Sequence, residues 1–331
     1  MRREGTGARP RNRGGVLIAL ESIERARAIT ADLVSPSPLI RLEVDGPCEI
    51  WLKLECLHPI GSFKLRGATS AIRQAEPDEW RNGVWTTSAG NMAQGVCWVA
   101  RLLGVPATVV APDHAPRAKL DAIERLGGTV VAVPFDTWWE TMETGAFPGI
   151  NGLFVHPVLD ERVMAGNGVI GLELAEQLGE LDAVLVPWGG GGLSTGIASA
   201  LAAVSPETRV VACEPATGAP FAASIATGER VDVDYTPSFV DGAGSKAVLP
   251  AMWERAQPLL SGAVAVPLDD VASAVRLLAT RARVVAEGAG ALALAAALAG
   301  HGGTGRAVCI VSGGNIDADL LASILVAGEP G

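Results

Sequence analysis

The chain has 331 residues, of which 49% are hydrophobic and 19% charged, and its formal net charge is −10 at pH 7. A single hydrophobic core stops growing at about 250–300 residues, so this length predicts two domains. The negative charge opposes binding to a phosphate backbone, and no basic stripe interleaved with aromatic residues offsets it. The sequence therefore argues against nucleic acid as a partner and favours a small molecule.

Cysteine spacing and apolar runs restrict the cellular setting. The five cysteines contain no C-x-x-C pair, which predicts neither a zinc site nor a disulfide framework. Reduced thiols of this kind are typical of a cytoplasmic protein. The longest apolar run, residues 288–300, is shorter than the roughly 20 residues of a bilayer span and is expected to be a buried helix, so no membrane association is predicted. Residues 1–20 are expected to form a disordered leader.

Short β-branched runs alternate with longer helical patterns from about residue 84 onward. This alternation predicts an α/β fold whose parallel sheets are joined by crossover helices. The expected strands are residues 84–87, 107–111, 129–133, 153–156, 183–187, 209–213 and 307–311. The expected helices are residues 92–103, ending before Gly104, 117–126, ending before Gly127, and 270–281, with Asp269 as N-cap. No linker separates two domains, so the chain is expected to cross between them more than once.

The segment G-S-F-K-L-R-G at residues 61–67 is the first with chemical content. Ser62 is its expected N-cap, and Lys64 falls in the first helical turn. The positive end of the helix dipole disfavours the ammonium form of this lysine and so helps to supply the neutral amine that Schiff-base chemistry requires. An ordinary surface lysine is the alternative that this segment leaves open.

Residues 88–91 join a predicted strand to a helix. Their backbone amides and the Ser88 hydroxyl can face an anion such as a substrate carboxylate, and the Asn91 amide can add a donor. Ala89 and Gly90 complete the turn. An ordinary capping loop remains the alternative.

A run of four glycines joins the strand at residues 183–187 to the next helix, and it consists of Gly189, Gly190, Gly191 and Gly192, followed by Leu193. Such a backbone can wrap an anion at a helix N-terminus, which favours a phosphate cradle over structural filler. The loop lacks the lysine of a nucleotide P-loop and the spacing of a dinucleotide fingerprint, which argues against a nucleotide-dependent oxidoreductase. Ser312 begins a fourth turn, S-G-G-N, after the last predicted strand. Because ligands gather beyond the carboxyl ends of parallel strands, these turns are expected to converge, although the last one alone is an ordinary turn.

The motifs S-F-K-x-R-G-A, S-A-G-N, G-G-G-G-L and S-G-G-N, in this order, resemble the serine/threonine dehydratase group of fold-type II pyridoxal-phosphate enzymes, within the tryptophan synthase β-like family. The resemblance covers about residues 25–325. It implies two domains, each an open, mostly parallel twisted sheet flanked by helices. The large cofactor-binding domain would comprise residues 21–82 and 158–331, and the small substrate-closing domain residues 83–157.

The resemblance also implies a role for each motif. Lys64 would be the catalytic residue that holds pyridoxal 5′-phosphate as a Schiff base, with Phe63 packed beside the ring. Asn91 would bind the cofactor's 3′-oxygen, residues 189–193 its phosphate, and Ser312 would face its pyridine nitrogen. Ser88, Ala89, Gly90 and Asn91 would receive the substrate carboxylate.

A hydroxyl such as that of Ser312 cannot hold the ring nitrogen as a pyridinium, so carbanions are stabilised less and β-elimination is favoured. The resemblance therefore implies an ammonia-lyase that converts L-threonine, L-serine or a close β-hydroxy amino acid to a 2-oxo acid and ammonia, and that acts as a homodimer. One alternative is a related elimination enzyme acting on 3-hydroxyaspartate or on an intermediate of compatible-solute breakdown. Another is a non-catalytic regulatory protein that binds the cofactor.

Several positions depart from, or refine, the family pattern. Met92 stands where the dehydratases commonly carry histidine, and Ala89 where serine racemases carry a serine that acts as a base. Pro220 occupies the place of an aspartate metal ligand after Glu214, so no metal site is expected. Glu287 would lie near the ring edge, with a solvated glutamate at a helix start as the alternative. The short stretch after Ser312 leads us to expect no C-terminal regulatory domain.

Overall fold

The computed structural model describes residues 17–327, so residues 1–16 of the predicted leader lie outside the described residues. The rest of that leader belongs to the fold. Ile18 is buried and its backbone amide donates a hydrogen bond to Ser199 Oγ at 3.0 Å. The first helix, α1 (Leu20–Thr30), starts inside the predicted leader as well. The boundary at residue 20 is therefore placed too late, because the apolar residues just before α1 pack on the core.

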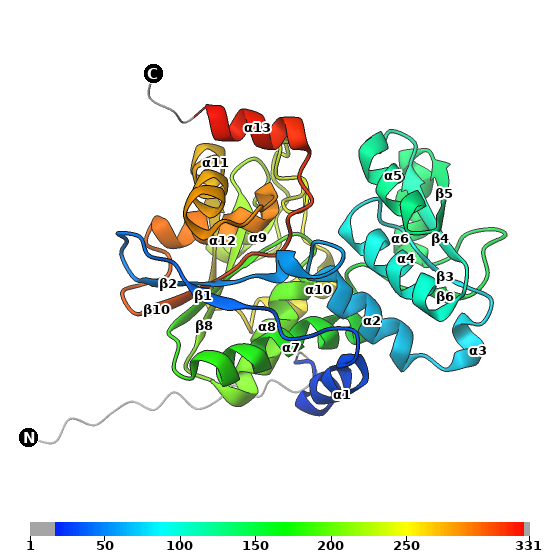
Figure 1. Cartoon of the computed structure of the whole chain (residues 1–331), viewed down its shortest axis with the longest axis horizontal. Helices are drawn as coiled ribbons and strands as arrows, with labels where there is room; N and C mark the ends of the chain where they lie inside the picture. Colours follow the sequence, from blue (N-terminus) through cyan, green and yellow to red (C-terminus); the bar gives the residue numbers. More distant parts are fainter. Residues whose placement is uncertain (1–16, 328–331) are drawn as a thin grey trace, which may run out of the picture.

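The larger of two sheets has six strands in the order β1-β2-β10-β7-β8-β9 (Figure 1). All neighbours are parallel except β1 and β2. The strands are β1 (Leu39–Arg41), β2 (Glu49–Lys53), β7 (Ala183–Pro187), β8 (Arg209–Pro215), β9 (Gly262–Val266) and β10 (Arg306–Ile310). Strand β7 is buried at all five positions, as expected for a central parallel strand covered on both faces.

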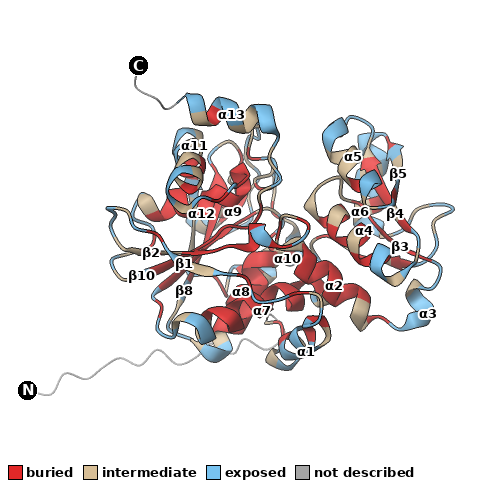
Figure 2. Cartoon of the chain, viewed as in Figure 1, coloured by how far each residue is buried: buried red, intermediate tan, exposed pale blue. Residues whose placement is uncertain are grey.

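Helices cover both faces of this sheet. Side chains alternate along β7, so that Ala183 and Leu185 join one core and Val184 and Val186 join the other. The first core packs against α11 (Leu268–Leu277), α12 (Gly288–Leu298) and α13 (Ala318–Val326). The second packs against α1, α7 (Glu161–Leu178), α8 (Gly192–Val204) and α10 (Pro250–Ala256). Figure 2 shows the buried residues concentrated along this sheet and the helix faces turned toward it.

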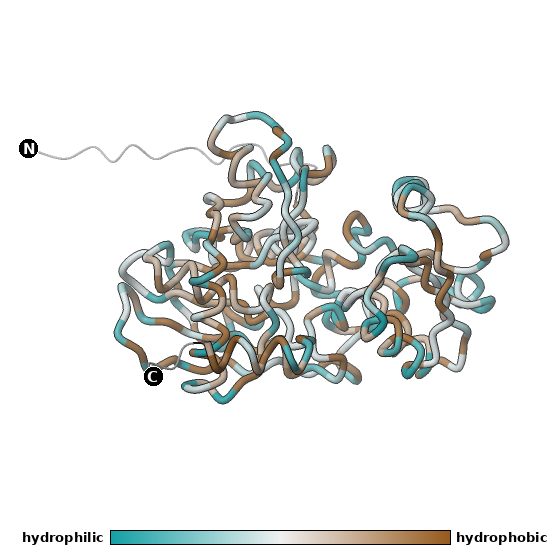
Figure 3. Tube along the Cα trace, turned by 90° about the horizontal axis from the view of Figure 1, so that it is seen from above, coloured by the Kyte–Doolittle hydropathy of each residue, from teal (hydrophilic) through white to brown (hydrophobic). Residues whose placement is uncertain are grey.

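The smaller sheet has four parallel strands in the order β5-β4-β3-β6. They are β3 (Val84–Thr86), β4 (Ala107–Pro112), β5 (Gly128–Val133) and β6 (Leu153–Phe154). The helices around it are α2 (Lys64–Gln74), α3 (Pro77–Trp80), α4 (Asn91–Leu103), α5 (Arg117–Arg125) and α6 (Phe135–Thr144). The remaining helix, α9 (Pro220–Thr227), belongs to the larger sheet region and follows β8. Figure 3 shows the two sheet regions side by side, with hydrophobic segments running through the interior of each.

The predicted α/β class with two open, mostly parallel sheets is confirmed, and all seven predicted strands are present within a few residues of their expected bounds. The glycine after α4 and the glycine after α5 both have the expected positive φ, 70° at Gly104 and 86° at Gly127. The Asp269 cap is wrong. Helix α11 begins at Leu268 with Pro267 in the N-cap position, and a π-helical turn extends it over Leu278–Ala282.

The boundaries of the two domains stay a prediction. The four strands of the smaller sheet fall within residues 83–157, but α2, outside that range, packs into the same core through Leu65 and Ala68. Within residues 17–327, no helix is long and apolar enough to cross a membrane. The five cysteines are free thiols.

Candidate active site

One cavity of about 510 Å³ brings the four motifs together. Its lining includes Phe63 and Lys64, residues 88–91, residues 189–193 and Ser312, which are all the positions predicted to contact cofactor or substrate. The motifs come from loops at the carboxyl ends of β3, β7 and β10 and from the start of α2. This is the convergence expected of ligand sites in open parallel sheets. A larger hollow of about 990 Å³ beside β6 contains none of these motifs.

Lys64 is the first residue of α2 and lies half-buried in this cavity. Its Nζ donates a hydrogen bond to the Pro157 carbonyl at 3.3 Å and lies 5.1 Å from the centre of the Phe63 ring. Burial lowers the pKa of the Lys64 amine to about 8, against the opposing effect of the Glu287 charge. The neutral, nucleophilic form at pH 7 is thereby enriched by roughly 300-fold over an exposed lysine. Desolvation in the cavity is the main cause of this pKa, and the surface-lysine alternative does not hold.

Ser62 does not cap α2, contrary to the expectation from sequence. The N-cap position is Phe63, and the Ser62 hydroxyl is buried without a hydrogen-bond partner among the described residues. The reason is tertiary. The segment forms a β-bridge between Ser62 and Gly313, and the Phe63 amide donates to the Ser312 carbonyl at 3.0 Å. These contacts hold the lysine segment against the turn that follows β10.

The glycine loop has the shape of an anion cradle. Gly191 has φ +91°, and a side chain at Gly190 would bring its Cβ within 2.4 Å of the Val158 side chain. The backbone therefore requires glycine here and approaches its neighbours closely. Helix α8 begins at Gly192, so its free amides and its dipole favour a phosphate at this loop. The loop and the Lys64 amine in one cavity fit the phosphate and the aldehyde carbon of pyridoxal phosphate.

Asn91, Glu287 and Asn315 form a chain of hydrogen bonds at the cavity wall. The Asn91 Nδ2 donates to Glu287 Oε1 at 2.8 Å, and Asn315 Nδ2 donates to Asn91 Oδ1 at 2.8 Å. Glu287 is only 6% exposed, so the alternative of a solvated glutamate does not hold. Burial raises the pKa of Glu287 to about 7, and the charge of Asp241 adds to this effect. The cavity thus holds two groups that titrate near neutral pH, Glu287 and Lys64.

The turn at residues 88–91 lines the same cavity. The Gly90 amide lies 3.3 Å from Ser88 Oγ, and α4 starts at Asn91. Met92 is also among the lining residues, although it is 1% exposed and packs in the core of the smaller sheet region. The residue that replaces the usual histidine therefore presents an apolar surface at the site.

Glu214 has a structural role. It is fully buried, and its carboxylate accepts hydrogen bonds from the backbone amides of Phe221 at 3.2 Å and Ala222 at 2.7 Å, at the start of α9. Burial raises the pKa of Glu214 to about 7. No group of three or more histidine, cysteine, aspartate or glutamate side chains suited to a metal ion occurs within residues 17–327.

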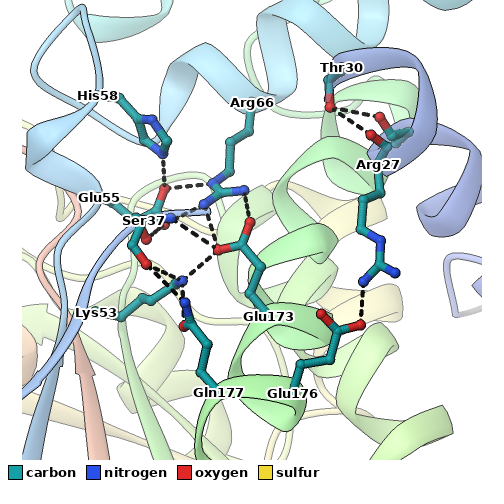
Figure 4. Close-up of polar contacts among 11 residues, drawn as sticks. Arg27, Thr30, Ser37, Lys53, Glu55, His58, Arg66, Glu173, Glu176 and Gln177 are labelled. Carbon is teal, nitrogen blue, oxygen red and sulfur yellow. Dashed lines mark hydrogen bonds and ion pairs between the residues drawn. The ribbon is translucent and has the colours of Figure 1, made fainter. Parts of the chain in front are cut away.

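The structure contains a buried cluster of charges beneath α2 (Figure 4). The sequence analysis did not predict it. The Arg66 guanidinium donates to Glu55 at 2.7 and 2.9 Å and to Glu173 at 2.6 and 2.9 Å, and Lys53 Nζ lies 2.5 Å from Glu173. His58 Nε2 lies 3.1 Å from Glu55. Burial alone would raise the pKa of Glu55, but Arg66 and His58 hold it well below its usual range. We call these five residues the buried charge cluster. It anchors the helix that carries Lys64, two residues before Arg66.

One signal in the sequence could have indicated this cluster. Glu173 interrupts the apolar pattern of α7, and Lys53 and Glu55 follow the apolar residues of β2. Charged residues within buried runs require partners, although their spacing along the chain does not say which.

Comparison with known proteins places these features in context. A family model described as "Pyridoxal-phosphate dependent enzyme" matches residues 30–313. The L-threonine ammonia-lyase of Thermotoga maritima is 37% identical over 324 residues, covering 94% of this chain and 79% of that protein. Among solved structures, maize serine racemase superposes with a TM-score of 0.82 at 29% identity, covering 93% of this chain and 97% of the other. The processed threonine deaminase isoform 2 of Solanum lycopersicum has a TM-score of 0.82 at 30% identity, with coverages of 93% and 87%.

Proposed function

Because the chain belongs to the family of pyridoxal-phosphate-dependent enzymes, we propose that it is an ammonia-lyase that eliminates water from L-threonine or L-serine. Elimination breaks the Cα–H and Cβ–O bonds, and hydrolysis of the resulting enamine gives a 2-oxo acid and ammonia. The observation that carries the proposal is the Lys64 amine, with its lowered pKa, in one cavity with the glycine cradle and Ser312.

Each residue of the site is assigned one part of the proposed reaction. The bound cofactor supplies the electron sink that makes the substrate Cα–H acidic. Lys64 holds the cofactor and, once released, accepts the Cα proton as general base. The amides of residues 189–193 would hold the phosphate, and Phe63 would pack beside the ring. Ser312 would be an uncharged partner for the pyridine nitrogen, which would favour elimination over reactions that need a long-lived carbanion.

The remaining roles concern orientation. Ser88, Ala89, Gly90 and Asn91 would receive the substrate carboxylate, and Asn91 would also bind the 3′-oxygen of the cofactor. Lys64 can accept the Cα proton from only one face of the substrate. Ala89 carries no hydroxyl to serve the opposite face, so racemisation is expected to be slow relative to elimination.

We further propose that residues 83–157 form the substrate-closing domain and that the enzyme works as a homodimer in the cytoplasm. The division follows the two sheets, and the free thiols suit a reducing compartment. The mass of the purified protein by light scattering tests the dimer. A monomer with full activity would contradict it.

The decisive experiment replaces the lysine. Lys64→Ala is expected to abolish 2-oxo acid release from L-threonine and L-serine, together with the visible absorbance of the lysine-bound cofactor. Lys246→Ala is the matched control, because Lys246 is exposed and outside the cavity, and it should keep both signals. Turnover retained in Lys64→Ala, or no 2-oxo acid from the wild-type enzyme despite bound cofactor, would contradict the proposal. The latter result would favour the non-catalytic alternative.

A 2-oxo acid assay on 3-hydroxyaspartate tests the alternative substrate. Lys119 is the only lysine besides Lys64 among the described residues lining the cavity, and the Asp241 carboxylate, 2.5 Å from it, lines the cavity too and would repel a second substrate carboxylate. Activity on 3-hydroxyaspartate is therefore expected to be lower than on L-threonine.

A further inference from the structure

A second cavity of about 530 Å³ adjoins the active site. Ser88, Ala89 and Trp138 line both cavities, as do Gly189 and Gly190 of the glycine loop. We call this second space the side compartment. The compartment therefore opens beside the turn assigned to the substrate carboxylate and the loop assigned to the cofactor phosphate, within reach of a long substrate side chain.

The lining of the side compartment includes several large apolar side chains, among them Trp138, Trp139, Met142, Trp188 and Leu249. Threonine and serine have side chains of only one or two heavy atoms beyond Cβ, and they would leave this space empty of substrate. Burial of a phenyl-sized group in such surroundings strengthens binding by roughly 10- to 100-fold. The volume and the lining therefore suit a larger β-substituent.

The charges around the side compartment exclude an acidic substituent. Glu143 and Asp241 are the acidic residues of its lining, and no lysine or arginine among the described residues lines it. His156 is held neutral, because burial lowers its pKa and its Nδ1 accepts hydrogen bonds from the amides of Val158 and Leu159 at 3.0 Å each. A negatively charged group would find no cation here.

An aromatic rim connects the two cavities at the surface. Phe135 of the active-site cavity is 49% exposed and Trp139 of the side compartment is 40% exposed. Their ring centroids lie 6.4 Å apart, and Trp138 lies 5.5 Å from Phe135 and 6.2 Å from Trp139. Exposed apolar side chains gathered at a cavity mouth are typical of a binding site for an apolar ligand.

We propose that the side compartment binds a bulky, uncharged, apolar β-substituent, so that the substrate class extends to β-hydroxy amino acids with an aromatic or branched aliphatic side chain. Catalysis on such substrates rests on the proposed function. The reaction is the same elimination, in which water leaves and the 2-oxo acid keeps the substituent, as in the conversion of L-threo-3-phenylserine to phenylpyruvate and ammonia.

Binding can be tested apart from turnover. L-Phenylalanine has no β-hydroxyl and cannot lose water, so its binding to the cofactor-loaded enzyme measures the compartment alone. Tryptophan fluorescence titration and inhibition of L-threonine turnover should both show L-phenylalanine binding at least about 10-fold more tightly than L-alanine. L-Threo-3-phenylserine should have a kcat/KM at least equal to that of L-threonine.

Two substitutions fill the compartment from different segments, Met142→Trp on α6 and Ala247→Phe before α10. Each should reduce the preference for L-phenylalanine over L-alanine to less than about threefold and lower kcat/KM for phenylserine at least 10-fold. Each should leave kcat/KM for L-threonine within about threefold. Glu140→Trp is the matched control, because Glu140 is exposed on α6 and lines neither cavity, and it should keep the preference.

Failure of the compartment proposal and failure of the proposed function would give different experimental results. If the wild-type enzyme dehydrates L-threonine but does not prefer L-phenylalanine over L-alanine, or if both filling variants keep that preference, the compartment proposal is overturned and the proposed function stands. If L-phenylalanine binds selectively and the filling variants abolish this binding, while no 2-oxo acid forms from any substrate, the compartment is supported and the proposed function fails.

Discussion

Two sets of opposite charges in this protein have similar N–O distances and very different surroundings. In the buried charge cluster, Arg66 is 2% exposed and Glu55 is fully buried. At the mouth of the active-site cavity, Lys119 of α5 lies 2.5 Å from Asp241, but their side chains are 33% and 52% exposed. Desolvation makes each member of the first set dependent on its partners, whereas water and salt screen the second.

The buried and the exposed ion pairs suit different structural roles. In the cluster, both carboxylates accept several hydrogen bonds from Arg66, Lys53 and His58, so the buried charges are matched. Such an arrangement fixes α2, and therefore Lys64, in one place. The pair at the mouth joins the smaller sheet region to the loop before α10 and can break at little cost.

The largest effect is expected from Arg66→Met. Removal of the guanidinium leaves Glu55 and Glu173 buried without their main partner, which should lower the free energy of unfolding by about 3–5 kcal/mol. Arg73→Met is the matched control on the same helix, because among the described residues Arg73 makes polar contacts only with the exposed Asp32 and the Ile29 carbonyl, and its loss should cost much less than that of Arg66. Denaturant titration of both variants measures the difference. Equal losses would contradict the comparison.

Glu287→Gln should have an intermediate and pH-dependent effect. The pKa of Glu287 is raised by burial from 4.5 to about 7, so the folded chain binds this proton more tightly than the unfolded chain. The unfolding free energy of the wild type therefore falls as pH rises from about 4.5 to 7, by up to roughly 3 kcal/mol. Glutamine keeps an acceptor for Asn91 and carries no charge. The variant should be more stable than the wild type at pH 8 and similar to it at pH 4.5.

Denaturant titrations of both proteins at these two pH values provide the measurement. A stability difference that does not change with pH would show that Glu287 is already ionised throughout. Glu143→Gln, at an exposed position, is the control for the substitution itself.

The smallest effect is expected from Lys119→Met. Loss of the exposed pair should change the free energy of unfolding by less than about 1 kcal/mol, and 1 M salt should remove most of the difference. The same variant should raise the pKa of Glu287 further, because Lys119 lowers it in the wild type. The pH titration described for Glu287, repeated in this background, detects the shift. A decrease in the free energy of unfolding as large as that of Arg66→Met would contradict the difference between the two sets of charges.

Sequence patterns predicted the elements and residues whose signals are local. Strands β7 and β10 are apolar runs, and a run of four glycines is itself a local signal, so the motif residues that line the cavity could be named in advance. Strands β1, β2 and β9 were missed, because they are short and mix apolar with charged or small residues. Ser62 and Asp269 were assigned as caps on local pattern, and tertiary contacts placed the helix starts elsewhere.

The features that sequence could not supply depend on segments distant along the chain. The pairing of Arg66 with Glu173 spans 107 residues. The side compartment takes Trp138 from α6, Trp188 from the end of β7 and Leu249 from the start of α10. Only the packing of the two sheet regions brings these side chains to one space.

The β-bridge between Ser62 and Gly313 has a consequence for biosynthesis. Strand β2 has β10 as its parallel neighbour, so Lys53 is in register with Ile310, although the ribosome adds them more than 250 residues apart. A nascent chain that ends before β10 lacks both the strand that separates β2 from β7 and the turn that holds the Lys64 segment. The cofactor site is therefore completed only after almost the whole chain has been translated, and truncated chains are expected to emerge without it.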